Sequence, residues 1–275
     1  MKKNLVLAAC LATAVVLPLT ASATAVVAGF SANTQPRNDD SSTALVNMGF
    51  TANFFGNTHS QLYVNTNGNV TFDSALSTFT PFNLTSTHRE IIAPFFADVD
   101  TRRAGDPVTY GGGMFAGRTA FGVNWLNVDY YSSSTSHTKR DSFQLILVDR
   151  SDTGSGNFDI VFNYDQIQWE TGGASGGSNG LGGASARAGY SNGTGNPGTS
   201  LELTGSAING AFLDGGVNAL VSHSLNSNIN GRYIFTARNG TIVTPPPVPT
   251  PEPAILALLS FGLIGIGFSR RHRRS

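Results

Sequence analysis

The sequence has 275 residues, enough for one large domain or two small ones; 12% of the residues are charged and 32 are glycine. This composition is poor in charge for a cytosolic protein and is typical of a loop-rich extracellular β protein. The formal net charge is zero, but residues 26–250 hold 11 basic and 16 acidic residues, a charge of −5. We therefore expect no nucleic-acid partner, because such binding needs a basic surface.

Residues 1–25 predict a cleavable secretory signal helix. Two lysines precede an apolar core, and two A-x-A patterns follow, which end at Ala23 and Ala25. We expect cleavage after one of these two residues. The run LAAC that ends at Cys10 resembles a lipoprotein signal box, but the apolar core continues beyond it. Cys10 is the only cysteine, so the mature protein has no disulfide and depends on its core for stability.

The body of the chain, residues 26–240, predicts β-strands almost throughout. In QLYVNTNGNVTF, two strand-like runs flank Asn67-Gly68, the strongest short signal for a hairpin. REIIAPFFADVD is a nearly continuous apolar run and predicts a strand buried on both faces. The last strand is expected at Gly231–Arg238. The Gly/Ser/Asn-rich residues 171–200 predict a long surface loop with one short strand near 186–190.

Three further segments alternate with a period of two, which places every second side chain on one face of a strand. The predicted inward faces are Phe121, Val123 and Trp125; Phe143, Leu145 and Leu147; and Phe158, Ile160, Phe162 and Tyr164. No segment of the body predicts a helix of several turns. We therefore expect an all-β fold, an antiparallel β-sandwich or barrel-like sheet, with a signal helix and a short apolar helix at the two ends.

The order of these strand segments resembles that of a known extracellular module. IIAPFFADVDTR, FGVNWLNVDYY, SFQLILVDR and GNFDIVFNYDQIQWE follow one another as in the nidogen-like (NIDO) domain. NMGFTANFFGNTHSQLYVNTNGNVTFD upstream and ARAGYSNGTG downstream extend the resemblance over most of residues 45–195. The resemblance implies an extracellular, non-enzymatic module associated with cell–matrix adhesion.

The C-terminal region has two parts: a proline-rich linker at residues 241–253 and an apolar segment with a basic end at residues 254–275. It resembles the PEP-CTERM sorting signal of Gram-negative bacteria. The motif residues are Pro251, Glu252 and Pro253, and the membrane-stop basic cluster is Arg270, Arg271, Arg273 and Arg274. The resemblance implies recognition by an exosortase in the inner membrane, removal of the tail, and release to the cell surface or an exopolysaccharide matrix.

The length of the apolar segment agrees with temporary membrane retention. As a helix, residues 254–268 rise about 22 Å, whereas the hydrocarbon core of a bilayer is about 30 Å thick. Arginine side chains at the end could extend toward the interface and remain cytoplasmic. The alternative is a permanent single-pass anchor.

Asp98 and Asp100 are candidate site residues because they lie two apart on a predicted strand and therefore on one face. The favoured interpretation is structural: they end a strand and pair with Arg102, Arg103 or Lys139. A second hypothesis is a calcium site, the one cofactor that we consider. The third is an acid–base pair in a glycan hydrolase. We assign no catalytic residue.

Two other features supply candidate contact residues. Asp39 and Asp40, in PRNDDSS, resemble the polar stretch before the nidogen-like module and are candidates to approach the same edge. Trp169 follows a strand and is expected to be half-exposed. It is therefore a better candidate for sugar contact than Trp125, which continues an inward face.

Taken with the resemblances, these features predict an exported surface or matrix protein that contacts extracellular polysaccharide or biofilm components without catalysis. Its expected partners are the exosortase and the matrix. The alternatives are a secreted glycan hydrolase that uses Asp98 and Asp100, and a self-associating surface-layer component.

Overall fold

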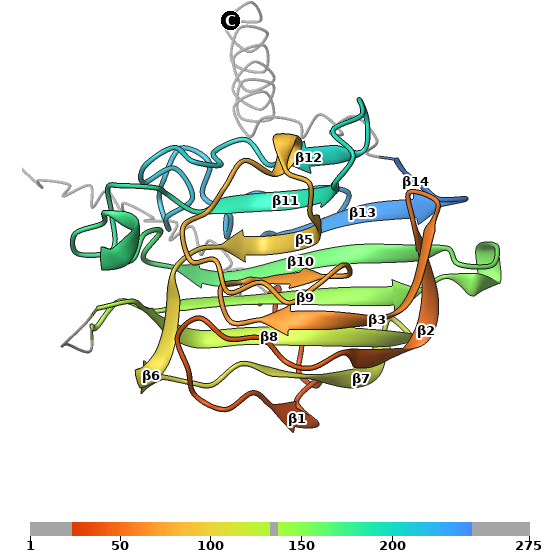
Figure 1. The fold of residues 1–275 in the computed structure, drawn as a ribbon, viewed down its shortest axis with the longest axis horizontal. Coiled ribbons are helices and arrows are strands. Elements are labelled where there is room, and N and C mark those ends of the chain that lie inside the picture. Colours follow the sequence, from red (N-terminus) through yellow and green to blue (C-terminus); the bar gives the residue numbers. More distant parts are fainter. Residues whose placement is uncertain (1–23, 133–136, 244–275) are drawn as a thin grey trace, which may run out of the picture.

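The computed structural model describes residues 24–132 and 137–243, which form two β-sheets packed face to face (Figure 1). The expected signal up to residue 23, most of the linker and the whole segment 254–275 lie outside the described residues, as do the sorting motif and its arginines. Within the described ranges, no helix is long and apolar enough to cross a membrane.

The larger sheet has eight strands, and all its pairings are antiparallel. Its order is β1 (Asn33–Thr34), β7 (Thr109–Phe115), β8 (Arg118–Tyr130), β9 (Asp141–Asp149), β10 (Phe158–Ile167), β13 (Arg232–Arg238) and β14 (Thr241–Val243), with β6 (Val99–Gly105) also paired to β8.

The smaller sheet has six strands and is also antiparallel throughout. Its order is β12 (Ser200–Glu202), β11 (Arg187–Asn192), β5 (Glu90–Phe96), β4 (Asn69–Thr71), β3 (Asn57–Asn65) and β2 (Val46–Phe54). The helices of the described residues are three short 3₁₀ segments: η1 (Leu84–Ser86), η2 (Ser151–Thr153) and η3 (Gly173–Ser175). The predicted all-β, antiparallel fold is confirmed.

A largely aromatic core fills the space between the two sheets. The predicted inward side chains all lie in it, each at most 1% exposed: Phe121, Val123, Trp125, Phe143, Leu145, Leu147, Phe158, Ile160, Phe162 and Tyr164. Phe95 of β5 meets Phe143 of β9 with ring centroids 5.2 Å apart. The Tyr164 hydroxyl donates a hydrogen bond to the Pro94 carbonyl at 2.6 Å, so this buried polar group also joins the sheets.

The predicted hairpin at Asn67-Gly68 is confirmed. Asn65 of β3 pairs with Asn69 of β4, and Gly68 between them has a φ of 73°. A Cβ on Gly68 would lie 1.7 Å from the Phe95 carbonyl oxygen. Glycine is therefore required both for the left-handed turn and for the close approach to β5.

The N-terminal segment covers the outer face of the larger sheet. Gln144 of β9 exchanges hydrogen bonds with the Val27 backbone at 2.9 and 3.2 Å. Gly122 leaves room for a buried ring, because a Cβ there would lie 2.4 Å from Phe30 Cγ. Phe30 packs in a second cluster with Ala120, Ile146, Val148 and Val161. The central strands of this sheet are thus buried on both faces.

The expectation of a half-exposed Trp169 is wrong, since this side chain is 0% exposed. Its ring contacts Phe95 with centroids 5.8 Å apart, and Nε1 donates to the Val128 carbonyl at 3.2 Å. Residues 171–200, the glycine-rich segment, fold back over this ring. A Cβ on Gly180 would lie 2.8 Å from Trp169 Cβ. Glycine permits this close backbone approach, which removes Trp169 from solvent and from sugar contact.

Candidate functional site

The candidate site lies where the chain leaves β5 in the smaller sheet and enters β6 in the larger one. Asp98 occupies this crossing. Asn67 holds the crossing in place, because its side-chain oxygen accepts from Val99 N at 2.9 Å and its carbonyl accepts from Ala97 N at 3.3 Å. The Asp98 carbonyl accepts from Tyr131 N at 2.9 Å. The Asp98 backbone is therefore fixed from both sheets.

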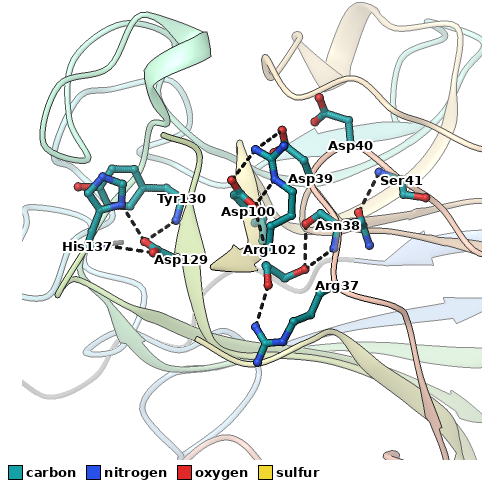
Figure 2. A network of polar contacts seen from close by, with 12 residues as sticks. Arg37, Asn38, Asp39, Asp40, Ser41, Asp100, Arg102, Asp129, Tyr130 and His137 are labelled. Carbon is teal, nitrogen blue, oxygen red and sulfur yellow. Dashed lines mark hydrogen bonds and ion pairs between the residues drawn. The ribbon is translucent and has the colours of Figure 1, made fainter. Parts of the chain in front are cut away.

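A separate segment, residues 35–43, brings two more carboxylates to the crossing. Asn38 is its anchor: its backbone N–H donates to Thr101 Oγ1 at 2.9 Å, and its carbonyl accepts from Thr101 N at 2.9 Å. Its side-chain oxygen accepts from Ser41 N at 3.1 Å, which turns the chain locally. Asp39 and Asp40 lie within this turn (Figure 2).

Asp39, Asp40 and Asp98 form an acidic cluster in which one carboxylate oxygen from each lies within 4.8 Å of the others. Asp98 is 1% exposed, and neither of its carboxylate oxygens has a hydrogen-bond partner among the described residues. The Ser175 N–H lies close enough to Asp98 to favour its ionised carboxylate, but this N–H donates its hydrogen bond to the Gly172 carbonyl. A buried, unpaired carboxylate is costly, so this arrangement needs an explanation.

Glycine at position 172 makes room for the Asp98 side chain. A Cβ on Gly172 would lie 2.3 Å from Asp98 Oδ2. On the other side of the cluster, Asn67 Nδ2 donates to Asp40 Oδ1 at 2.8 Å. The acidic cluster is thus enclosed by the β5–β6 crossing, residues 35–43, the β3–β4 turn and the glycine-rich segment.

Asp100 has a different environment from Asp98. Its carboxylate forms a bidentate ion pair with Arg102, with Nε–Oδ1 at 3.0 Å and Nη2–Oδ2 at 2.8 Å. Arg102 Nη2 also contacts Asp39 Oδ2 at 2.9 Å, so the guanidinium lies between two carboxylates (Figure 2). The predicted pairing with Arg102 is found for Asp100. The structure groups Asp98 with Asp39 and Asp40, and Asp100 with Arg102.

The electrostatics of the acidic cluster favour neutralisation. Burial, followed by the negative charges of Asp39 and Asp40, raises the pKa of Asp98 to about 7. Burial, together with Asp100 and Asp40, raises the pKa of Asp39 to about 6 despite the opposing charge of Arg102. Burial also raises the pKa of Asp40. At neutral pH these groups would be stabilised by a proton or by a bound cation.

A second polar group lies beside the acidic cluster on β8. Asp129 is 2% exposed and lies opposite Asp100 in the β6–β8 pairing. Its Oδ1 lies 3.0 Å from His137 Nδ1, and the His137 ring stacks on Tyr130 with centroids 3.8 Å apart (Figure 2). Asp129 has hydrogen-bond and ion-pair partners, so its burial is explained by structure alone.

Sequence reasoning identified Asp98 but did not establish its partners. Asp39 and Asp40 lie about sixty residues earlier in the chain, and no local periodicity connects them with the β5–β6 crossing. The available signal was the density of Asp and Asn in PRNDDSS and NTNGN, both of which contribute to the enclosure.

Comparison with known proteins identifies the family. The nidogen-like domain matches residues 60–239. The chain belongs to this family. The match extends further toward the C-terminus than the segments that suggested the resemblance, and it includes β13, which pairs with β10 in the larger sheet.

Alpha-tectorins are among the curated relatives of this chain. The chain is 38% identical to alpha-tectorin from Mus musculus and 36% identical to that from Homo sapiens, each over 181 residues that cover 58% of this chain and 8% of the tectorin. Alpha-tectorin from Gallus gallus is 32% identical over 224 residues, covering 73% of this chain and 10% of the tectorin. The chain therefore spans a tenth or less of these relatives. No solved structure matches it significantly.

A second family match lies in the tail. The PEP-CTERM protein-sorting motif matches residues 249–274, which include Pro251, Glu252 and Pro253 and the terminal arginines. Both resemblances seen in the sequence are confirmed. The protein is an exported extracellular protein with a sorting motif of the kind that exosortases process.

Proposed function

We propose that this protein is a non-enzymatic matrix-interaction module that contacts extracellular polysaccharide or biofilm components after export. The observation that carries the proposal is the presence of a nidogen-like domain and a PEP-CTERM sorting motif on one chain. In this proposal the tail holds the protein briefly at the inner membrane. An exosortase then removes the tail and the folded domain reaches the cell surface or the matrix.

The contact surface in this proposal is the long connection between β12 and β13, residues 203–231. The middle of this loop is anchored to the fold, because buried Glu170 accepts from Gly210 N at 2.6 Å and from Phe212 N at 2.7 Å. Two apolar side chains of the loop are nevertheless exposed, Ile208 at 56% and Val217 at 82%. A loop ordered before binding loses little entropy on contact, which suits a binding surface.

The hydrolase alternative receives no support from the geometry. A glycosidase needs two carboxylates that reach a sugar, one on each side of the scissile bond. Asp98 is 1% exposed and Asp100 is 4% exposed, and Asp100 is engaged by Arg102. Neither carboxylate is presented to a polysaccharide chain.

The test is co-sedimentation of the purified protein with exopolysaccharide from its own host, compared with an unrelated polysaccharide. We expect binding to the host polymer, and we expect the double variant Ile208→Asp, Val217→Asp to weaken it. Met114→Asp is the matched control, because Met114 is 62% exposed on β7 and outside the loop.

Absence of binding to the host polymer would refute the polysaccharide part of the proposal. If the protein instead sediments alone as large assemblies, the self-associating surface-layer alternative gains support. Equal loss of binding in Met114→Asp and in the loop variant would show that residues 203–231 are not the contact surface.

A further inference from the structure

We propose that Asp39, Asp40 and Asp98 bind one calcium ion, which fastens residues 35–43 to the β5–β6 crossing. This inference does not depend on the proposed function. It rests on two independent observations: the convergence of three carboxylates from two distant segments, and the unpaired, buried side chain of Asp98 that is directed into the cluster.

The spacing of the carboxylates suits a single ion. Oxygens bound to one Ca²⁺ lie 2.3–2.6 Å from it and hence at most about 5 Å from each other. The three carboxylates meet this limit as they stand, within 4.8 Å. Asp98 is held by backbone contacts on both sides, so it forms the fixed base of the site.

The nearby guanidinium does not replace the ion. Arg102 contacts Asp100 and Asp39 Oδ2, and no ion pair joins it to Asp98. Asp39 Oδ1 is buried and has no hydrogen-bond partner among the described residues. Asp39 can therefore keep its pair with Arg102 through one oxygen and offer the other to a cation. Together with Asp100, the cluster and Arg102 carry a formal charge of −3, which attracts a divalent cation.

The donor set favours calcium over other divalent cations. All three side chains offer hard oxygen ligands, and no histidine or cysteine belongs to the cluster within the described residues, which argues against zinc. Mg²⁺ demands strict octahedral geometry and is usually bound by only one or two carboxylates, whereas Ca²⁺ accepts six to eight oxygens in flexible arrangements. Water and backbone carbonyls would complete the shell.

The first experiment is calorimetric titration of the full chain, purified in chelator and then exchanged into chelator-free buffer, with CaCl₂ and separately with MgCl₂ at constant ionic strength. Extracellular calcium modules bind with Kd of about 0.1–1 mM. We expect a saturable calcium signal with one site in this range. At calcium about tenfold above Kd, the melting temperature should rise by about 3–6 °C.

Asp98→Asn supplies the decisive comparison. It removes the charge while keeping the shape, so calcium binding should weaken at least about tenfold and the calcium-dependent rise in melting temperature should fall to about a third or less of the wild-type rise. Without calcium, this variant should melt at or above the temperature of the wild-type protein, because it no longer buries an unpaired charge. A purely structural Asp98 would give the opposite result, a lower melting temperature and no calcium effect in either protein.

Two further variants keep the test valid if Asp98→Asn fails to fold. Asp40→Asn changes a half-buried residue of the same cluster and should also weaken calcium binding. Asp106→Asn changes an exposed aspartate that lies outside the acidic cluster, and it should leave the calcium response unchanged. The proposal is overturned if wild type gives no calcium signal, if Asp40→Asn and Asp98→Asn bind as tightly as wild type, or if magnesium stabilises the protein equally.

Discussion

Two of the regions that bury carboxylates differ in how those carboxylates are hydrogen-bonded. In the first region, around the end of β10, buried Glu170 accepts two backbone hydrogen bonds from the 203–231 loop, and Asp141 Oδ1 accepts from Gln168 N at 2.7 Å and Trp169 N at 3.2 Å. In the acidic cluster, Asp98 is equally buried but accepts no hydrogen bond from the described residues.

This difference separates structural carboxylates from ligand carboxylates. A carboxylate that accepts backbone N–H groups recovers much of its lost hydration and fixes a loop. A carboxylate that faces only other carboxylates recovers none, and its burial is compensated when a proton or a cation is bound.

The largest effect is expected for Glu170→Ala. It removes two charge-assisted hydrogen bonds and leaves the Gly210 and Phe212 N–H groups without their acceptor. We expect a loss of about 3 kcal/mol in the free energy of unfolding, measured by urea denaturation. Asp152→Ala is the control: its exposed carboxylate pairs with Arg118 and Arg150 at the surface, so stability should stay nearly unchanged. A small loss for Glu170→Ala would mean that the loop is held by its apolar contacts.

Gly172→Ala should have the next largest effect. The new methyl group would overlap the Asp98 carboxyl, so either the crossing or the glycine-rich segment must move. We expect a loss of about 2 kcal/mol together with weaker calcium binding. The neighbouring Gly173→Ala is the matched control, because a Cβ there would meet its nearest atom, the Tyr131 carbonyl oxygen, at an ordinary 3.6 Å. Equal behaviour of the two variants would contradict the enclosed site.

Asp141→Asn tests the first region through pH. Burial raises the pKa of Asp141 well above its usual value, the negative charges of Asp214 and Glu170 add to this, and the two backbone donors oppose it. The folded state therefore holds this proton more tightly than the unfolded chain. The stabilisation is full below pH about 4 and is lost as pH rises toward the folded pKa.

The variant should remove that loss. In calcium-free buffer, the wild-type free energy of unfolding should fall with pH above about 4 more steeply than that of Asp141→Asn, by up to about 1.4 kcal/mol per pH unit. The measurement is urea denaturation of both proteins at a series of pH values. Parallel curves would show that Asp141 is ionised throughout and that its two donors outweigh burial.

Arg232 extends the comparison to a buried cation. Its contacts are expected to have the smallest effect, which is on the choice of the signal-cleavage site. Its guanidinium donates to Asn163 Oδ1 at 2.8 Å and to the Ala25 carbonyl, and Ala25 is 1% exposed. Signal cleavage after Ala25 would remove that acceptor, whereas cleavage after Ala23 would keep it. We therefore expect N-terminal sequencing of the exported protein to begin at Thr24. A start at Val26 would show that the fold does without this contact.

The core side chains of β8, β9 and β10 were predictable because the face on which each one lies is determined by the alternation within its own strand. Alternation placed Phe121, Val123 and Trp125 on one face, and the same pattern in β9 and β10 placed seven further side chains in the core. Each prediction needed only neighbours within one strand.

The acidic cluster and Trp169 were beyond local reasoning for the same physical reason. The cluster depends on Asn38 and Asn67 bringing distant turns to the β5–β6 crossing. Trp169 is buried because the later glycine-rich segment folds over it. A low-complexity sequence has no hydrophobic periodicity, so such packing cannot be predicted from it. Asp98 was identified from the sequence, whereas its environment came from tertiary structure.

We expect the exported nidogen-like domain to be sorted and released through its C-terminal motif. The measurement that tests it most directly is the intact mass of the protein from the envelope and matrix fractions of its host. We predict a matrix species that lacks the signal and ends near Pro253. A membrane-bound species that retains Arg270 to Arg274, with none in the matrix, would contradict the account and make the tail a permanent anchor.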